Sequence, residues 1–403
     1  MSVSARARVL YVEPFYWTGG PHNVLRNLLE GLDRDSFDPY AVVPRHGEAT
    51  EQFGEIGVPV ERLIAMHNIG RKGGPVVMAA GGLKSAIGAV QVALFAKSRS
   101  ADLVHTNNET CLSGPLGARL AGKPSVVHVH GLGFSRSKVT ATAVVGILNA
   151  TADRVVAVSS VVADALRKNG VKDNKIRVVH NGIDTSRYRP GLASLHLRGE
   201  FQLETEQLSV GMIGGLEPRK GHKLFLEAAA LVCKQRKNVR FFIVGEPVPG
   251  DSASDRYQRE VHALSGSLGL KDAVVFTGGR TDVPNMLAML DIVVQPSTTE
   301  AAPLVPLESM SAGTPVVATD VGGNREEVAD QETGILVPPG DASGIARAVV
   351  TLLDSPELRA RMGEAGRVRV EAEFSTAAMA HRIEDLYRDL WADLRKRTAA
   401  KRG

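Results

Sequence analysis

Short apolar runs alternate with amphipathic segments along the first half of the chain. The apolar run Arg8–Glu13 is followed by a Gly19-Gly20 turn and by Pro21–Leu32, where apolar residues recur at helical spacing. Because strands that alternate with helices usually form parallel, doubly wound sheets, we predict an α/β fold. Further strand-like runs lie at Tyr40–Pro44, Asp102–Thr106, Ser125–His130, Arg154–Ser159 and Ile176–His180.

The same alternation continues through the second half. We predict a helix over Lys223–Lys234, between the first two strands of this half. The segment Asp184–Gln207 lacks strand-like runs and contains Pro190, Gly191 and Gly199, so we expect the domain boundary there. The strand-like runs of this half are Leu208–Ile213, Val239–Val244, Ala273–Phe276, Asp291–Gln295, Pro315–Ala318 and Thr333–Val337.

Length and the last helix complete the predicted organisation. A chain of 403 residues exceeds one ordinary core, so we predict Rossmann-like domains at residues 1–190 and 200–375. Ser375 can cap a final helix, residues 376–395, whose apolar stripe must be buried somewhere. We expect this helix to pack back on the first domain. Its stripe consists of Met379, Ile383, Leu386, Tyr387, Leu390 and Leu394.

One long apolar stretch, Pro75–Ala96, has to be weighed against a membrane span. Lys84 lies inside it and Gly81-Gly82 interrupts it. Because a central lysine is costly in hydrocarbon, we interpret the stretch as a buried or interfacial helix.

Composition and charge narrow the function classes. The chain is 43% hydrophobic and 23% charged, with a formal net charge of +4. No long basic stripe with interleaved aromatic residues is present, which argues against nucleic-acid binding. Met1–Arg8 lacks an apolar signal core, so we expect a cytoplasmic protein. The C-terminal tail is basic and is either a solvated end or a contact to an anionic membrane surface. Its cations are Arg395, Lys396, Arg397, Lys401 and Arg402.

Metal sites and disulfides are not expected. Cys111 and Cys233 are far apart in the sequence and have no partners at metal-binding spacing. Asp33 and Asp35 have the spacing that some sugar transferases use for a divalent metal, but they lie in an ordinary connection between a helix and a strand.

Two carboxylates in the second half are the most informative candidates for chemistry. Glu300 follows the strand-like Asp291–Pro296, at the edge where open α/β sheets bind ligands. Glu308 lies inside a short helix that ends at Gly313. The N-terminal N–H groups of this helix suit an anion. A carboxylate pair beside such a helix start suggests a nucleotide sugar as ligand.

A glycine-rich loop, Gly211–Gly221, carries two cations between a strand and a helix. Gly214 and Gly215 permit a close approach of the backbone, while Arg219 and Lys220 bring positive charge to the sheet edge. A leaving diphosphate needs this neutralisation. The other interpretation is an exposed basic loop. We favour phosphate contact because the loop and Glu300 are predicted to share one sheet edge.

The first half offers weaker signals. The Gly19-Gly20 turn precedes a helix and suggests a lid over a phosphate or an acceptor, and we predict His22 as a surface residue. His128 and His130 lie on the same face of an apolar strand, because side chains alternate along strands. We predict His130, at the strand end, to hydrogen-bond a sugar hydroxyl, and His128 to be a packing residue.

Taken together, these blocks resemble glycosyltransferase family 4, the retaining enzymes of the GT-B fold. The likeness covers nearly the whole chain, and the block from Glu300 to Val317 is the most specific part. The blocks that carry it are Gly19-Gly20, His130-Gly131, Ala157-Val158-Ser159, His180-Asn181-Gly182-Ile183-Asp184, Pro218-Arg219-Lys220-Gly221, Phe276-Thr277-Gly278, Glu300–Glu308 and Gly313-Thr314-Pro315-Val316-Val317.

The resemblance implies two facing Rossmann-like domains with an interdomain cleft, the acceptor mainly in the first and the donor in the second. It implies that Glu308 holds the ribose hydroxyls, that Glu300 contacts the donor sugar, and that the backbone near Gly278–Arg280 meets the base. It also implies transfer without a metal or other cofactor. The implied catalytic set is Glu300, His130, Lys220 and Arg219, and the donor-binding set is Glu308, Gly19, Gly20, Gly214, Gly215, Arg219, Lys220, Gly278, Gly279, Arg280, Ala302, Pro303, Leu304 and Val305.

The chain departs from the family pattern in two places. Many members have an arginine where Gly214 or Gly215 stands here, so Arg219 either replaces it or points outward. Ala301-Ala302-Pro303 stands in place of a glycine-rich link.

The expected function is therefore a retaining glycosyltransferase that uses a UDP- or GDP-linked sugar. Its acceptor would be a carbohydrate, a glycolipid or a small molecule, in polysaccharide, glycolipid or glycoside biosynthesis, with peripheral membrane contact as a further expectation. The alternatives are a sugar-nucleotide epimerase or hydrolase on the same scaffold, and a non-catalytic two-lobed sugar-binding protein.

Overall fold

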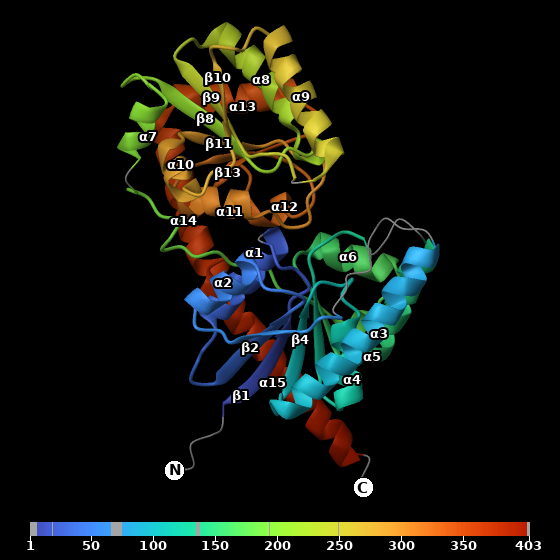
Figure 1. Ribbon diagram of the computed structural model, residues 1–403. Helices are drawn as coiled ribbons and strands as arrows, with labels where there is room; N and C mark the ends of the chain where they lie inside the picture. The colour runs from blue at the N-terminus through green and yellow to red at the C-terminus, as the bar shows by residue number, and fades with distance from the viewer. Residues whose placement is uncertain are drawn as a thin grey trace. The chain divides into compact units, whose positions relative to one another are not determined.

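The computed structural model describes residues 6–17, 19–65, 75–133, 138–192, 194–248 and 250–400, without the side chains of 75–80 and 397–400. These residues form two compact units (Figure 1). The first unit is Met1–Gly182 together with Thr376–Gly403, and the second unit is Ile183–Ser375. The division between Gly182 and Ile183 comes just before the predicted linker.

The first unit is built on a seven-stranded parallel sheet with the order β3-β2-β1-β4-β5-β6-β7. The strands are β1 Ala7–Val12, β2 Phe37–Val43, β3 Val60–Arg62, β4 Leu103–Asn107, β5 Ser125–Val129, β6 Arg154–Ala157 and β7 Ile176–Val178. The helices are α1 Gly20–Gly31, α2 Glu48–Glu55, α3 Pro75–Ser98, α4 Ser113–Ala121, α5 Lys138–Thr151, α6 Ser160–Lys168 and α15 Thr376–Ala400, with a 3-10 turn at Asp173–Lys175. The short, largely exposed edge strand β3 was not predicted, because it contains no apolar run.

The second unit has a six-stranded parallel sheet with the order β10-β9-β8-β11-β12-β13. The strands are β8 Leu208–Ile213, β9 Val239–Val244, β10 Val274–Gly278, β11 Ile292–Gln295, β12 Val316–Thr319 and β13 Gly334–Val337. The helices are α7 Leu195–Glu200, α8 His222–Gln235, α9 Ser252–Ser267, α10 Val283–Met289, α11 Leu304–Ser311, α12 Asn324–Glu327, α13 Ala342–Asp354 and α14 Pro356–Glu373, with a 3-10 turn at Pro218–Lys220. The predicted α/β fold with two doubly wound parallel sheets is therefore confirmed.

The order of strands reverses once in each sheet. Strands are added outward from β1 in one direction and from β4 in the other, and the same holds for β8 and β11. In open α/β sheets, ligands bind in the crevice beyond the carboxyl ends of the strands at such a reversal. The topology thus selects one edge of each sheet for the search for a functional site.

The last helix, α15, belongs to the first unit although the second unit precedes it in sequence (Figure 1, red). The hydroxyl of Tyr387 lies 3.1 Å from that of Tyr11 on β1 and 2.6 Å from His105 Nδ1 on β4. Glu384 accepts a hydrogen bond from the Asp33 backbone N–H at 2.8 Å. The predicted return of this helix to the first domain is confirmed.

Helix α3 packs closely on α4 and leaves an apolar stripe exposed. A Cβ atom at Gly117 of α4 would lie 2.6 Å from Val92, so only glycine allows this approach. The outer side chains Leu83, Ile87, Val90 and Leu94 are between 48% and 65% exposed, which fits the predicted interfacial character better than full burial. Within the described ranges, no helix is both long and apolar enough to cross a membrane.

The buried hydroxyl of Tyr387 is expected to stabilise the first unit. Tyr387→Phe leaves His105 Nδ1 and the Tyr11 hydroxyl without this partner, so the free energy of unfolding should fall by about 1–3 kcal/mol. Tyr40→Phe is the matched control, because the buried Tyr40 hydroxyl has no hydrogen-bond partner among the described residues. Urea denaturation should show a loss for the first variant only, and equal losses would contradict this account.

Candidate functional site

The sheet reversal in the second unit brings two loops together. One loop follows β8 and contains Gly214–Gly221, and the other follows β11 and contains Pro296–Pro303. The backbone N–H of Thr298 donates to the Arg219 carbonyl oxygen at 2.9 Å and so ties the loops to each other. This is the sheet edge that the sequence selects for the two cations and Glu300.

Lys220, Arg219 and Glu300 form a compact cluster of charges at this edge. Lys220 Nζ lies 2.7 Å from Glu300 Oε1, and Arg219 Nη1 lies 3.4 Å from Glu300 Oε2. Arg219 is 43% exposed and also pairs with Glu217, whereas Glu300 is only 6% exposed. Arg219 therefore points toward Glu300, but it divides its ion pairs between Glu300 and Glu217. The structure brings together these three predicted residues.

Glycines fix the loop that carries Glu300. Gly322 has φ +52°, and a Cβ atom there would lie 1.7 Å from the Glu300 carbonyl oxygen. A Cβ atom at Gly323 would lie 2.6 Å from the Ala301 carbonyl oxygen. The backbone of the turn after β12 thus supports Glu300 and the adjacent segment directly.

Glu308 has an environment of its own within helix α11. It is 9% exposed, and burial raises the pKa of its carboxyl to about 7. The Tyr188 side chain, through a hydrogen bond, and the Arg187 charge act to lower that pKa. Glu308 thus has Tyr188 and Arg187 as neighbours, while Glu300 has Lys220 and Arg219. The carboxylates have separate partners although α11 starts only a few residues after Glu300.

The start of α11 offers free backbone donors. Pro303 occupies the N-cap position and provides no side-chain cap. First-turn N–H groups have no acceptor inside their own helix, and those of Leu304 and Val305 donate no hydrogen bond within the described structure. These two donors and Ala302 belong to the segment supported by Gly322 and Gly323. The arrangement suits an anion, as the sequence predicts.

The remaining predicted donor residues border the same edge. Gly214, with φ +152°, packs against the Lys220 side chain, and a Cβ atom at Gly245 would lie 2.0 Å from the Gly214 carbonyl oxygen. Gly215 follows directly. Gly278 ends β10 with φ +71°, and a Cβ atom at Gly279 would lie 2.7 Å from the Glu246 carboxyl carbon.

The Arg280 side chain, in contrast, is committed to structural ion pairs. It lies 2.7 Å from Glu200 and 2.7 Å from Asp282. A base contact at this position would therefore come from the backbone, which is the form in which it is predicted.

A second polar cluster lies at the strand ends of the first unit. His130 Nε2 is 2.7 Å from Asn107 Oδ1, and Asn107 Nδ2 donates to Glu13 Oε2 at 2.7 Å. These residues come from the carboxyl ends of β5, β4 and β1, so two of them flank the sheet reversal. Burial, followed by the charges of His128 and His105, lowers the pKa of His130 well below 6.5.

The other first-half predictions have mixed outcomes. His128 is fully buried and stacks on His130 with ring centroids 4.4 Å apart, so it is a packing residue as predicted. His22 is also buried, 3.6 Å from Glu13, and its prediction as a surface residue is wrong. A Cβ atom at Gly19 or Gly20 would meet no atom within 4 Å, so their role as a lid stays a prediction.

The predicted loops and termini are only partly described. From the sequence, the variable loops Gly47–Gly74 and Gly133–Val139 are the candidates for building the acceptor site of the first domain. They include residues 66–74 and 134–137, and the basic tail includes 401–403, all outside the described residues. Asp33 Oδ1 accepts from the Asp35 backbone N–H, as in an ordinary turn. Across the described ranges, no group of three or more His, Cys, Asp or Glu side chains is arranged to hold a metal ion.

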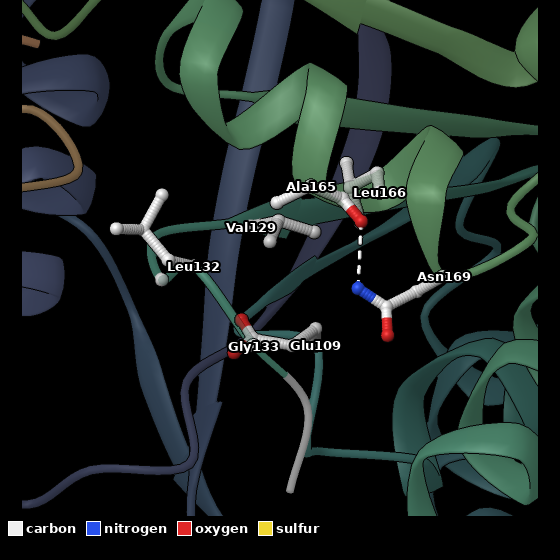
Figure 2. Close-up of a pocket in the computed structure, with 8 residues that line it drawn as sticks. Glu109, Val129, Leu132, Gly133, Ala165, Leu166 and Asn169 are labelled. Atoms are coloured by element: carbon white, nitrogen blue, oxygen red, sulfur yellow. Dashed lines mark hydrogen bonds between the residues drawn. The ribbon is translucent and has the colours of Figure 1, made fainter. Parts of the chain in front are cut away.

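A small pocket adjoins the His130 strand end (Figure 2). The space between its lining residues is too narrow to admit a water molecule, so the pocket is far smaller than the roughly 300 Å³ at which ligand pockets begin. Glu109, from the loop after β4, contributes a buried carboxyl group. Figure 2 shows the labelled lining residues Glu109, Val129, Leu132, Gly133, Ala165, Leu166 and Asn169.

Comparison with known proteins identifies the family. The family described as Glycosyltransferase Family 4 matches residues 18–187, and the family described as Glycosyl transferases group 1 matches residues 196–369. The D-inositol 3-phosphate glycosyltransferase of Streptomyces avermitilis is 32% identical over 320 residues, which cover 75% of this chain and 68% of the relative. The chain belongs to glycosyltransferase family 4.

Two further similarities agree with this membership of family 4. The UDP-Gal:alpha-D-GlcNAc-diphosphoundecaprenol alpha-1,3-galactosyltransferase of Escherichia coli is 28% identical, over 73% of this chain and 77% of the relative. The crystal structure of Anabaena HepE in complex with UDP and glucose matches with a TM-score of 0.81 and 24% identity, over 95% of this chain and 99% of that one. This structural likeness confirms the GT-B fold.

Sequence reasoning missed three side chains around Glu300 of this family 4 protein. Gln295 Nε2 and Ser297 Oγ donate to Glu300 Oε1 at 3.1 and 2.8 Å. Glu327 is buried, and its Oε2 atom has no hydrogen-bond partner among the described residues. Burial, then the charges of Glu300 and Glu326, raises the pKa of Glu327 well above 4.5. For Gln295 and Ser297, the available signal was a polar residue at or just after the end of an apolar strand.

The raised pKa of Glu308 predicts a pH-dependent stability. The folded state favours the neutral form of the Glu308 carboxyl group. This preference stabilises the folded protein fully below pH 4.5, and the stabilisation is lost as the pH rises through about 7. Relative to Glu308→Gln, the natural protein should lose about 3 kcal/mol of unfolding free energy between pH 4 and pH 8. The control is Glu364→Gln, on the exposed surface of α14. Parallel curves for the natural protein and Glu308→Gln would refute this assignment.

Gly322 and Gly340 offer a matched test of the loop support. Both have positive φ. A Cβ atom at Gly322 would collide with the backbone, whereas a Cβ atom at Gly340 would meet no other atom within 4 Å. Gly340→Ala should cost only the backbone strain, about 1–3 kcal/mol. Gly322→Ala should cost clearly more and lower the midpoint of thermal unfolding further. Equal midpoints would show that the contact with Glu300 is not a constraint.

Proposed function

We propose that this family 4 glycosyltransferase moves a sugar from a nucleoside diphosphate sugar to an acceptor hydroxyl, with retention of anomeric configuration. The observation that carries the proposal is the cluster of Lys220, Arg219 and Glu300 at the sheet reversal of the second unit. It combines cations for a diphosphate with a carboxylate for sugar hydroxyls in one place. The family resemblance supports the retaining outcome.

The proposed donor is a uridine diphosphate sugar. The Escherichia coli relative is named for UDP-Gal, and the HepE structure is described as a complex with UDP and glucose. In this proposal Lys220, Arg219 and the N–H groups of Leu304 and Val305 bind the diphosphate. Glu308 accepts hydrogen bonds from the ribose hydroxyls and Glu300 from the donor sugar.

The proposed chemistry exchanges one bond at the anomeric carbon. The bond from that carbon to the diphosphate oxygen breaks, and a bond to the acceptor oxygen forms on the same face. The acceptor proton passes to the departing phosphate oxygen. The role of the protein is to neutralise the negative charge that develops on the diphosphate, which Lys220 and Arg219 are placed to do. The proposed reaction has no step at a metal ion or a resident cofactor.

The acceptor side of the proposal rests on the first unit. Relatives are named for inositol 3-phosphate and for a diphosphoundecaprenol-linked sugar, and hydroxyl groups are common to both. His130 is the proposed hydroxyl contact in this unit. Cytoplasmic location and peripheral membrane contact stay predictions from the sequence.

Substitution of Lys220 tests the donor site. Because a charge-assisted hydrogen bond contributes about 1.5–3 kcal/mol, Lys220→Ala should weaken UDP binding by about 10–100-fold in calorimetry. Lys223→Ala is the control, since Lys223 lies one turn further along and pairs with Glu260 on the surface. Unchanged UDP affinity in Lys220→Ala would refute the assignment.

Product analysis separates the proposed reaction from its rivals. Incubation with UDP-glucose, UDP-galactose or GDP-mannose and candidate acceptors should give a glycoside with the donor's anomeric configuration in proton NMR spectra. An inverted product would refute retention. Conversion of the donor without any acceptor gaining a sugar would favour the epimerase or hydrolase.

A further inference from the structure

Three polar side chains form a continuous hydrogen-bonded chain at the strand ends of the first unit. They are Glu13 after β1, Asn107 at the end of β4 and His130 after β5. The two links, Asn107 Nδ2 to Glu13 Oε2 and Asn107 Oδ1 to His130 Nε2, are both 2.7 Å long. Family membership and the proposed donor site leave Glu13 and Asn107 without a role.

The chemistry of its neighbours fixes the orientation of the Asn107 amide. Nδ2 lies 2.7 Å from a Glu13 carboxyl oxygen and 3.1 Å from the Pro21 carbonyl oxygen. A backbone carbonyl can only accept hydrogen bonds, so the amide nitrogen has to face this side. The amide oxygen, an acceptor, then faces His130 Nε2.

This orientation determines the tautomer of His130. An amide oxygen accepts only from a protonated ring nitrogen, so the proton lies on Nε2. In the neutral ring, Nδ1 then carries a lone pair. Nδ1 has no hydrogen-bond partner among the residues that the structure describes. Burial beside His128 and His105 lowers the pKa of His130 and keeps the ring neutral.

Glu13 anchors the other end of the chain. Its side chain is fully buried, and Oε1 accepts a hydrogen bond from the Phe15 backbone N–H at 3.0 Å while Oε2 accepts from Asn107. His22 Nδ1 lies 3.6 Å from Oε2. Hydrogen bonds that run in one direction polarise each other in a buried setting, so the carboxylate strengthens the acceptor character of His130 Nδ1.

We propose that Glu13 and Asn107 are positioning residues that hold His130 as the Nε2–H tautomer, so that Nδ1 accepts a hydrogen bond from a hydroxyl group of the sugar substrate. This inference rests on the proposed function, because it takes that substrate as the source of the hydroxyl. The chain then runs from hydroxyl to His130, from His130 to Asn107 and from Asn107 to Glu13. Each group donates toward the buried carboxylate.

The tautomer can be measured without any substrate. Long-range proton–nitrogen NMR spectra of protein labelled with ¹⁵N-histidine distinguish protonated from unprotonated ring nitrogens, and His130→Gln assigns the signals. We expect the natural protein to show Nε2 protonated and Nδ1 unprotonated. A proton on Nδ1 would overturn the inference and leave the proposed glycosyl transfer untouched.

Two variants test the positioning role. Asn107→Ala removes the acceptor for Nε2, and Glu13→Gln, which keeps the side-chain volume, removes one of the acceptors that orient Asn107 and Phe15. Both should give a mixture of tautomers. Asn27→Ala is the control, since Asn27 is a buried asparagine of the same unit that bonds to the Gly182 carbonyl oxygen at 2.8 Å. It should leave the His130 spectrum unchanged.

Sugar transfer and UDP binding provide the second readout. The two variants should lower kcat/KM by about 10–100-fold with UDP affinity unchanged within about twofold, because the hydrogen bond is to a sugar hydroxyl. Unchanged tautomers or unchanged kcat/KM in both variants would overturn the positioning role. Absence of transfer by the natural protein, with the expected tautomer present, would instead refute the proposed function.

Discussion

The ion pair between Lys220 and Glu300 is the interaction on which the second unit's site depends. It joins the loop after β8 to the loop after β11, with 2.7 Å between Nζ and Oε1. A buried carboxylate is tolerated only with partners, and Glu300 has Lys220, Arg219, Gln295 and Ser297. Without these groups the nearly buried Glu300 side chain would lack the hydrogen-bond and charge partners that a buried polar group needs.

The same pair also affects the neighbouring carboxyl group of Glu327. Burial, followed by the Glu300 charge, which Lys220 only partly offsets, raises the pKa of Glu327 well above its ordinary range. A negative charge close to a carboxyl group disfavours the charged form of that group. Lys220 and Arg219 pair with Glu300, and the raised pKa of Glu327 favours its neutral form. Removal of Lys220 would therefore disturb both Glu300 and Glu327. Removal of Lys223, which pairs with Glu260, takes away the same charge without touching either group.

Sequence patterns were sufficient for the fold because the sheets are parallel and buried. Strands such as Leu208–Ile213 and Val239–Val244 are largely apolar runs, and their predicted bounds agree with the structure. The stripe of α15 predicted its burial but not the hydroxyl of Tyr387 between β1 and β4. Edge strand β3 escaped prediction since it is three residues long and mostly exposed.

The part of the site that could be predicted consists of charged residues that directly follow predicted strands. Glu300, Arg219 and Lys220 are neighbours because their strands flank one reversal, which the alternation of strands and helices already implies. The burial of His22 and the partners of Glu308 depend on side chains brought in from distant segments. No local pattern specifies such contacts. This explains why His22 was wrongly placed on the surface.

The two units treat charge in opposite ways at equivalent edges of their sheets. In the second unit, cations and carboxylates meet at the reversal, which suits a guest that carries phosphate charge. In the first unit, burial lowers the pKa values of His105, His128 and His130, and Asn107 links His130 to the Glu13 carboxyl group. A neutral acceptor nitrogen backed by a buried carboxylate discriminates against anions and favours hydroxyl groups. The division of charge therefore parallels the division between a diphosphate donor and a hydroxyl acceptor that the proposed reaction requires.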